Sequence, residues 1–188
     1  CSSGGGTSNC ITQINAGASS TTLEVKGNIN INQYGILQYQ NNLAEYVIAD
    51  NDINIASGGA LQVRNGGNSV ANTLTVYGNI INNGTFDLDS NYPTNDNYYC
   101  TLIFTGSLSK SLTSTSTPTR TRLYGITVNK GTSRDSILNV NVDPTGFQMG
   151  GGGLNLQNGT FRLTSSVTMP LSTGGFSIPS TACLSANG

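Results

Sequence analysis

Short phrases of aliphatic residues, glycine and asparagine recur along this chain at nearly constant intervals. LEVKGNI, which begins at residue 23, returns 51 residues later as LTVYGNI. INI, which begins at residue 29, returns after 24 residues, and NGTF at residue 83 returns after 75. These intervals are close to two, one and three multiples of about 25 residues, a period typical of solenoid coils. The chain is therefore expected to wind into stacked coils.

Apolar and polar residues alternate inside these phrases, as in Phe161 and Leu163, which lie two apart. This is the period of a β-strand, and no window of a dozen residues shows the 3.6-residue spacing of an amphipathic helix. The strands expected on this basis cover residues 23–31, 52–56, 74–80, 85–88, 126–129, 138–142, 154–156 and 160–163. We predict an all-β fold, a right-handed parallel β-helix (β-solenoid) of about seven coils that forms one domain over residues 1–188. Residues 1–20, which are rich in glycine and serine, are expected to be a cap or tether.

In such a solenoid the equivalent strands of successive coils stack, so inward side chains form apolar columns. The positions expected to point inward are Leu23, Val25, Ile29, Ile31, Leu74, Val76 and Ile80. Several glycines are expected at corners, where a positive φ is needed and a Cβ atom would clash. They are Gly27, Gly35, Gly59, Gly78, Gly84 and Gly159. Stacked asparagine side chains are expected to bond to one another along the corners.

The charge of the chain argues against several function classes. Only 9% of the residues are charged, against about 25% in an average soluble domain, and the formal net charge is −1. With eight Lys and Arg residues there is no positive field to attract a phosphate backbone, so nucleic acid is not expected as a partner. No apolar run approaches the roughly 20 residues of a membrane span. The chain also lacks histidine, the usual base of a catalytic triad.

The chain contains four cysteines, an even number, at Cys1, Cys10, Cys100 and Cys183. No C-x-x-C pair is present, so disulfides are favoured over a zinc site, and they imply an oxidising compartment. Of the three possible pairings we prefer Cys1 with Cys10 and Cys100 with Cys183, because the first closes a short Gly/Ser loop. In an alternative interpretation, Cys1 is the lipidated first residue of a processed bacterial lipoprotein.

Four phrases along the chain fit a pattern that reads roughly G-N-hydrophobic-x-N-x-G-T-F, then F-x-G, then a hydrophobic-T-hydrophobic-N strand. They are GNIINNGTF at 78–86, FTG at 104–106, ITVNK at 126–130 and LNLQNGTF at 154–161. They resemble the repeats of large secreted and surface adhesin-like proteins of gliding and gut bacteria, many of which are exported by the type IX route. The resemblance implies a right-handed β-helix-like scaffold and an extracellular or cell-surface location. The triplet DSI is similar to the acid-Ser/Thr-hydrophobic motif that these bacteria O-glycosylate, which makes Ser136 a candidate for glycosylation. The alternative is a polar turn before a strand.

Acidic residues gather in and after the phrase TFDLDSN. Asp87 and Asp89 alternate with apolar residues, so both carboxylates are expected to project outward from one face, about 6–7 Å apart. This spacing suits the acid pair of a glycosidase. Together with Asn91 and Asp96 the two carboxylates also supply hard oxygen ligands of the kind that calcium prefers. The third interpretation is a set of exposed acids at a strand end.

Three tyrosines, Tyr92, Tyr98 and Tyr99, cluster in the loop that follows. A phenol offers an apolar face and a hydrogen-bonding tip, so these residues are candidates for stacking on a sugar ring; alternatively, they pack the loop against the coil. Five basic residues without an intervening acid follow at Lys110, Arg120, Arg122, Lys130 and Arg134. They could hold an anionic glycan, with Arg120 and Arg122 as ligand-binding residues, or belong to a solvated loop.

These observations favour a non-catalytic function. We expect a structural or adhesive segment of an extracellular bacterial surface protein, which displays loops on a stiff solenoid and needs no cofactor, except for the possible calcium ion. Its expected partners are extracellular or cell-surface glycans, or further copies or segments of the same protein. Two alternatives stay open, a glycan-binding module and a polysaccharide-degrading β-helix enzyme.

Overall fold

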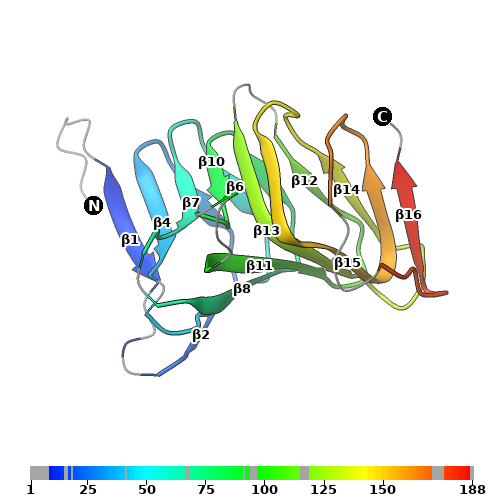
Figure 1. Cartoon of the computed structure of the whole chain (residues 1–188), viewed down its shortest axis with the longest axis horizontal. Helices are drawn as coiled ribbons and strands as arrows, with labels where there is room; N and C mark the ends of the chain where they lie inside the picture. The colour runs from blue at the N-terminus through cyan, green and yellow to red at the C-terminus, as the bar shows by residue number, and fades with distance from the viewer. Residues whose placement is uncertain are drawn as a thin grey trace.

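The computed structural model shows that the chain folds into a β-solenoid of parallel strands (Figure 1). The structure describes residues 9–14, 17, 19–40, 42–66, 68–90, 92–93, 97–114, 119–170 and 176–186. Sixteen strands form about six turns, and the described residues contain no helix. None of their segments is therefore a helix that could span a membrane. The predicted all-β solenoid is confirmed.

The strands stack in three parallel ladders, which correspond to three sides of the coil. The first ladder contains β1 (Cys10–Ile14), β4 (Gly35–Tyr39), β7 (Ala60–Val63), β10 (Thr85–Asp87) and the first parts of β13 (Arg120–Asn129) and β15 (Phe147–Leu163). The second contains β2 (Thr22–Val25), β5 (Tyr46–Ala49), β8 (Val70–Val76), β11 (Tyr98–Thr105) and later parts of β13 and β15. The third contains β3 (Ile29–Ile31), β6 (Ile53–Ile55), β9 (Ile80–Asn82), β12 (Lys110–Thr113), β14 (Ile137–Asn141), the end of β15 and β16 (Ala182–Ala186).

Each of the first four coils contributes one strand to each ladder, whereas β13 spans two ladders and β15 spans all three. In Figure 1 the colour accordingly changes from blue to red along the long axis of the molecule. The predicted seven coils become about six because one coil is longer than the repeat. Paired residues Leu37 and Leu61 are 24 positions apart, but the paired residues Phe86 and Thr121 are 35 apart. The right-handed winding stays a prediction.

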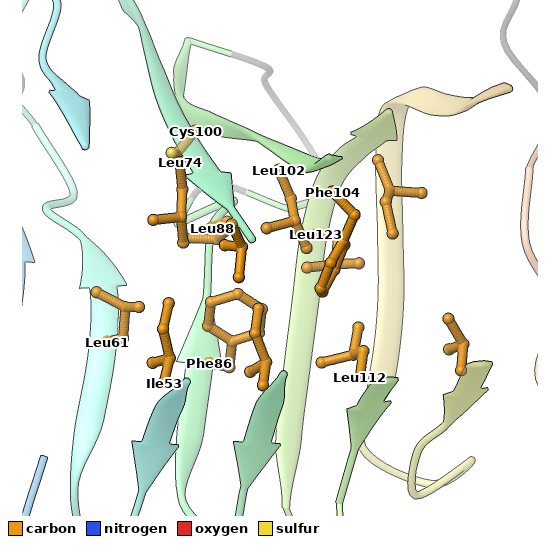
Figure 2. Packing of buried hydrophobic residues seen from close by; sticks show 14 of the residues in the cluster. Ile53, Leu61, Leu74, Phe86, Leu88, Cys100, Leu102, Phe104, Leu112 and Leu123 are labelled. Carbon is orange, nitrogen blue, oxygen red and sulfur yellow. The ribbon is translucent and has the colours of Figure 1, made fainter. Parts of the chain in front are cut away.

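The inward side chains form the apolar columns that the repeats predict. In the second ladder Val47, Leu74 and Leu102 stand on one another in register, and all three are at most 2% exposed. Figure 2 shows Leu74, Leu102 and Phe104 meeting side chains of the other ladders in the interior. Across the whole cluster the burial is nearly complete, so each apolar residue stabilises its coil by roughly 1.5–3 kcal/mol.

Leu23 lies on the inward side of its strand, in line with the buried Val47, but it is 47% exposed and is not part of the buried core. It stands in register with Val47, but β2 pairs with β5 alone among the described strands, so no described coil covers its other side. Val25 is half-buried for the same reason. The residues that stack on it in the next two coils, Ala49 and Val76, are fully buried. Ile29 is also half-buried, and Ile31 is buried as expected.

The corner glycines fit the prediction in position but not in backbone conformation. Of the six glycines singled out by the repeats, Gly159 alone has a positive φ, at 85°. At Gly78 the reason for glycine is the close approach of coils: a Cβ atom would lie 2.3 Å from the backbone C and O atoms of Asn51. A Cβ atom at Gly27, in contrast, would meet nothing within 4 Å. Glycine is therefore required at Gly78 because the backbone of the preceding coil lies against it, and no such contact exists at Gly27.

Asparagine side chains bond between coils as predicted, but one of the pairs, Asn30 with Asn54, lies in the middle of strands β3 and β6 and not at a corner. The side-chain nitrogen of Asn54 donates to the side-chain oxygen of Asn30 at 2.9 Å, and Asn158 donates to Asn129 at 2.8 Å. The partners in each pair belong to successive coils of the same ladder. Such a bond satisfies the outward amide of one coil with that of the next and helps to hold the two in register.

The phrase NGTF does not mark the same position in each coil. Its first copy leads into β10 of the first ladder, whereas its second copy ends in the third-ladder part of β15. Phe86 and Phe161 therefore lie on different sides of the solenoid, and the interpretation of their separation as three whole coils is wrong. The two shorter intervals hold, because Ile29 pairs with Ile53, and Leu23 reaches Leu74 through Val47.

The cysteines do not pair as expected. Cys100 and Cys183 are both free thiols, which corrects the predicted disulfide between them. Cys100 is fully buried in the core, and Cys183 lies on β16, where it pairs in register with Thr160. Cys10 is disulfide-bonded, but Cys1 lies outside the described residues, so the pair Cys1–Cys10 and the lipidation of Cys1 stay predictions. Part of the predicted tether, Cys10–Ile14, is strand β1.

Candidate ligand-binding surface

The winding brings residues of three successive coils into one outward row on the first ladder. Parallel register places Asp87 beside Arg122 and Arg122 beside Gln148. Inward residues alternate with this row, so Phe86 and Leu88 are fully buried. The row is a direct consequence of the solenoid: residues 87, 122 and 148 become neighbours because each occupies the same place in its coil.

Asp87 joins two arginines of the next coil. Its Oδ2 atom lies 3.3 Å from Nη1 of Arg120 and 3.3 Å from Nη1 of Arg122. The Arg120 side chain is 52% exposed, whereas that of Arg122 is only 11% exposed. Burial raises the pKa of the Asp87 carboxyl above its usual value, although the positive charge of Arg122 acts in the opposite direction. The ion pairs between Asp87 and the two arginines connect one coil to the next.

The predicted outward pair of carboxylates does not exist on the surface. Asp87 is 6% exposed and Asp89 is fully buried. The cause is the connection between β10 and β11, which folds back on itself: the backbone nitrogen of Ser90 donates to the carbonyl of Tyr98, and Asp89 forms an antiparallel bridge with Tyr99. A buried pair cannot flank a glycosidic bond of an extended polysaccharide.

The structure describes only two of the four predicted calcium ligands. Asn91 and Asp96 lie outside the described residues, so the set of four stays a prediction. The described part of the chain contains no group of three or more Asp, Glu, Cys or His residues that could hold a metal ion. Asp87 meanwhile directs one carboxylate oxygen to two guanidinium groups, which compete with any cation.

The three tyrosines of the loop take separate places. The ring of Tyr99 stacks on that of Tyr124, with 3.8 Å between centroids and 23° between planes. Tyr98 is half-buried and packs against the core. Tyr92 alone stays at the rim of a pocket, with the guanidinium carbon of Arg122 5.7 Å from the centroid of its ring. The predicted platform of three tyrosines is thus reduced to one.

A pocket of about 510 Å³ lies beside this row. Its walls come from the loop after β10, the start of β15 and the segment that follows β15. The lining residues are Tyr92, Pro144, Phe147, Gln148, Met149, Ser166, Val167, Thr168 and Pro170. Gln148, Ser166 and Thr168 did not emerge from the sequence as candidates, because uncharged residues of common types carry no motif. The one available signal was the register that sets Gln148 one coil after Arg122.

The basic residues do not form the patch that their spacing suggests. Lys130 is fully buried, and its Nζ atom donates to the carbonyl of Thr105 at 2.8 Å. Burial, reinforced by the positive charge of Lys110, lowers the pKa of Lys130 to about 8. Arg134 donates to the carbonyl of Ser180 at 3.1 Å. Arg120 and Arg122 share the single carboxylate of Asp87, which offsets one of their two positive charges.

Ser136, the candidate for O-glycosylation, is only 7% exposed. Its hydroxyl donates to the carbonyl of Ser107, and its own carbonyl accepts from the backbone nitrogen of Thr160. The side chain thus belongs to the contact between coils, where a glycan would find no room in the folded chain. The alternative interpretation of DSI, a polar turn before strand β14, agrees with this placement.

A scan against protein-family models, a search of curated proteins and a search of solved structures each found no match to this chain. The fold and the geometry described above are therefore the basis for the functional argument.

Proposed function

We propose that the chain is a non-catalytic structural or adhesive segment of an extracellular bacterial surface protein, which presents loops on a stiff β-solenoid. One observation carries this proposal: where one coil is longer than the repeat, the extra residues lie in its connections, and its strands stay in register with those of the next coil. Residues 88–97 and 114–119 lengthen one coil, yet β10 pairs with β13 without a shift. A scaffold that absorbs insertions in this way is suited to displaying loops.

The stacking also supports a rigid, resistant rod. Each described strand pairs in parallel with an equivalent strand of a neighbouring coil, and inward columns fill the interior with apolar side chains. Backbone groups are satisfied between coils, so few edges are left for other chains or proteases. Few charges are needed, in agreement with a composition of 9% charged residues.

The acids favour a non-catalytic role. A polysaccharide lyase or hydrolase needs acidic or basic groups that reach its substrate, and Asp87 and Asp89 are buried. Asp87 further belongs to an ion-pair cluster with Arg120 and Arg122 that joins two coils. The resemblance of the repeats, such as GNIINNGTF at 78–86, to those of secreted bacterial adhesin-like proteins adds support for surface display and for export by the type IX route.

A second candidate, a glycan-binding module, has one specific observation in its favour. The pocket of about 510 Å³ at Tyr92 falls within the range of about 300–1,000 Å³ that is usual for small-molecule sites. The two functions are compatible, because an adhesive segment needs some contact with a surface.

The proposal is tested by exchanging loops on beads that carry the purified chain. In one variant a short Gly/Ser turn replaces residues 90–97, and in the matched control the same turn replaces residues 64–66 of the connection before β8. We expect both variants to keep the β-type circular dichroism spectrum, and only the first to lose adhesion to mucin-coated surfaces. Equal adhesion by both variants would contradict display through the longer loop.

A turnover assay separates this proposal from the enzymatic alternative. The chain is incubated with a broad panel of neutral and acidic polysaccharides, and new reducing ends and unsaturated uronates are measured. We expect none to be released. Release of either product that disappears in an Asp89→Asn variant would establish catalysis and replace the adhesive function.

A further inference from the structure

The pocket beside Gln148 lies where the loop after β10 can reach across later coils. Coils formed by β13 and β15 have no connection at the corner between the first and second ladders, because each strand runs straight through it. Tyr92 therefore lies against Arg122 of the next coil and lines the same pocket as Gln148, one coil further on. Three coils and the segment after β15 contribute to one site.

The lining of this pocket is uncharged. Its nine residues include no Asp, Glu, Lys or Arg. Arg122, which contacts the lining residue Gln148, is already engaged: it donates through Nη1 to Asp87 and to the carbonyl of Asp89, the latter at 3.2 Å, and through Nε to Gln148. A charged ligand would find no ion-pairing partner among the lining residues, so the chemistry of the site favours a neutral ligand.

The polar side chains that line the pocket are exposed, whereas the apolar side chains that β15 contributes to it are buried. Phe147 and Met149 are 9% and 6% exposed, whereas Gln148, which alternates with them, is exposed. Ser166 and Thr168, from the segment after β15, line the same pocket and are also exposed. The Oε1 atom of Gln148 accepts from Arg122 at 2.9 Å, which leaves its amide NH₂ group as a donor toward a ligand.

The walls are held in place before any ligand arrives. Arg122 fixes the ring of Tyr92 by a cation–π contact and is itself fixed by Asp87. On the opposite side, the carbonyl of Pro170 accepts from the backbone nitrogen of Leu154 at 3.3 Å, which ties the segment after β15 to the second ladder. Such preorganisation reduces the entropy lost on binding.

From these features we infer that the pocket binds a neutral pyranose unit of a glycan. A pyranose has an apolar C–H face, which matches the ring of Tyr92 and the apolar lining residues Phe147 and Met149. It also has a rim of hydroxyls, which match the amide of Gln148 and the hydroxyls of Ser166 and Thr168. The inference rests on the proposed adhesive function and names the ligand class for one of its surfaces. The basic segment around Arg120 is not part of this site.

The test is a titration of the whole chain with soluble oligosaccharides. Cellobiose, maltose and lactose represent neutral pyranoses, and digalacturonic acid and a heparin disaccharide represent anionic ones; binding is detected by saturation-transfer NMR and measured by calorimetry. We expect at least one neutral sugar to bind. Tyr92→Ala should weaken it about tenfold or more, and Thr168→Val about twofold to tenfold. Tyr77→Ala, which removes an exposed tyrosine outside the pocket, should leave it unchanged.

Three results would overturn the inference: no binding of a neutral sugar at millimolar concentration, binding of the anionic sugars alone, or neutral-sugar binding that persists in both pocket variants. Thr168→Val keeps the test decisive if Tyr92→Ala fails to fold, because it replaces one hydroxyl at the pocket with a methyl group. A failure here is distinguishable from failure of the proposed function. In the first case the loop exchange still abolishes bead adhesion, and in the second case adhesion is unaffected.

Discussion

Two glycines in identical phrases should respond in opposite ways to the same substitution. Gly27 and Gly78 each begin GNI, and neither has a positive φ. A Cβ atom at Gly78 would lie 2.3 Å from backbone atoms of Asn51, whereas one at Gly27 would meet nothing within 4 Å. A Cβ atom in ordinary van der Waals contact lies at least 3.4 Å from its neighbours. Gly78→Ala must therefore move the two coils apart by about 1 Å, where neighbouring strands are normally about 4.8 Å apart.

Overpacking of this size costs about 1–3 kcal/mol, because the obstacle is backbone that cannot rotate away. At about 2–4 °C per kcal/mol for a chain of this length, Gly78→Ala should lower the melting temperature by roughly 2–12 °C. Gly27→Ala should instead stabilise the chain by about 0.4–1 kcal/mol, because alanine restricts the unfolded state. Thermal unfolding followed by circular dichroism measures both. If the two variants shift equally in the same direction, the glycines serve the local turn and the argument from coil contact is refuted.

Two further predictions concern buried titratable groups. Burial raises the pKa of the Cys100 thiol and shields it from reagents. Iodoacetamide at pH 8 should therefore label Cys183 in the folded chain and leave Cys100 unlabelled until denaturant is added, as measured by peptide mass spectrometry. Labelling of both cysteines at equal rates would contradict the placement of Cys100. Burial lowers the pKa of Lys130 from 10.5 to about 8, so between these pH values the unfolded chain binds a proton that the folded chain has released, and stability rises with pH. Lys130→Met should remove this rise in melting temperature between pH 8 and pH 10, and an unchanged slope would show that other groups cause it.

The repeats predicted the scaffold because stacked coils repeat their requirements. Ile29 and Ile53 pair as expected, since both occupy the same inward position of the third ladder. Strand Gly35–Tyr39 was not predicted, although its G-x-L-Q phrase returns 24 residues later at residues 59–62 and pairs with that copy in register, because a single short match of this kind went unused. NGTF misled the count because Asn and Gly mark a tight corner, and a solenoid with three sides has more than one such corner per coil.

The candidate site was predictable only in part. Tyr92 and Arg122 stood out by residue type and do lie together at the pocket. The prediction that Asp89 is exposed was wrong. Alternation shows which side of a strand a residue faces, but it does not reveal that the connection after β10 folds back and covers Asp89. Gln148 and Thr168 were not predicted as site residues. They lie near Tyr92 only because the winding of the chain brings together residues that are dozens of positions apart in the sequence.

The parallel ladders have a mechanical consequence. Tension applied across the two ends would peel the terminal coil away from its neighbour before the next coil bears load, so the chain would lengthen in steps. One repeat, from Ile29 to Ile53, contains 24 residues and would release roughly 80–90 Å of contour length. A tether that unspools in this manner dissipates a sudden pull while the remaining windings stay intact.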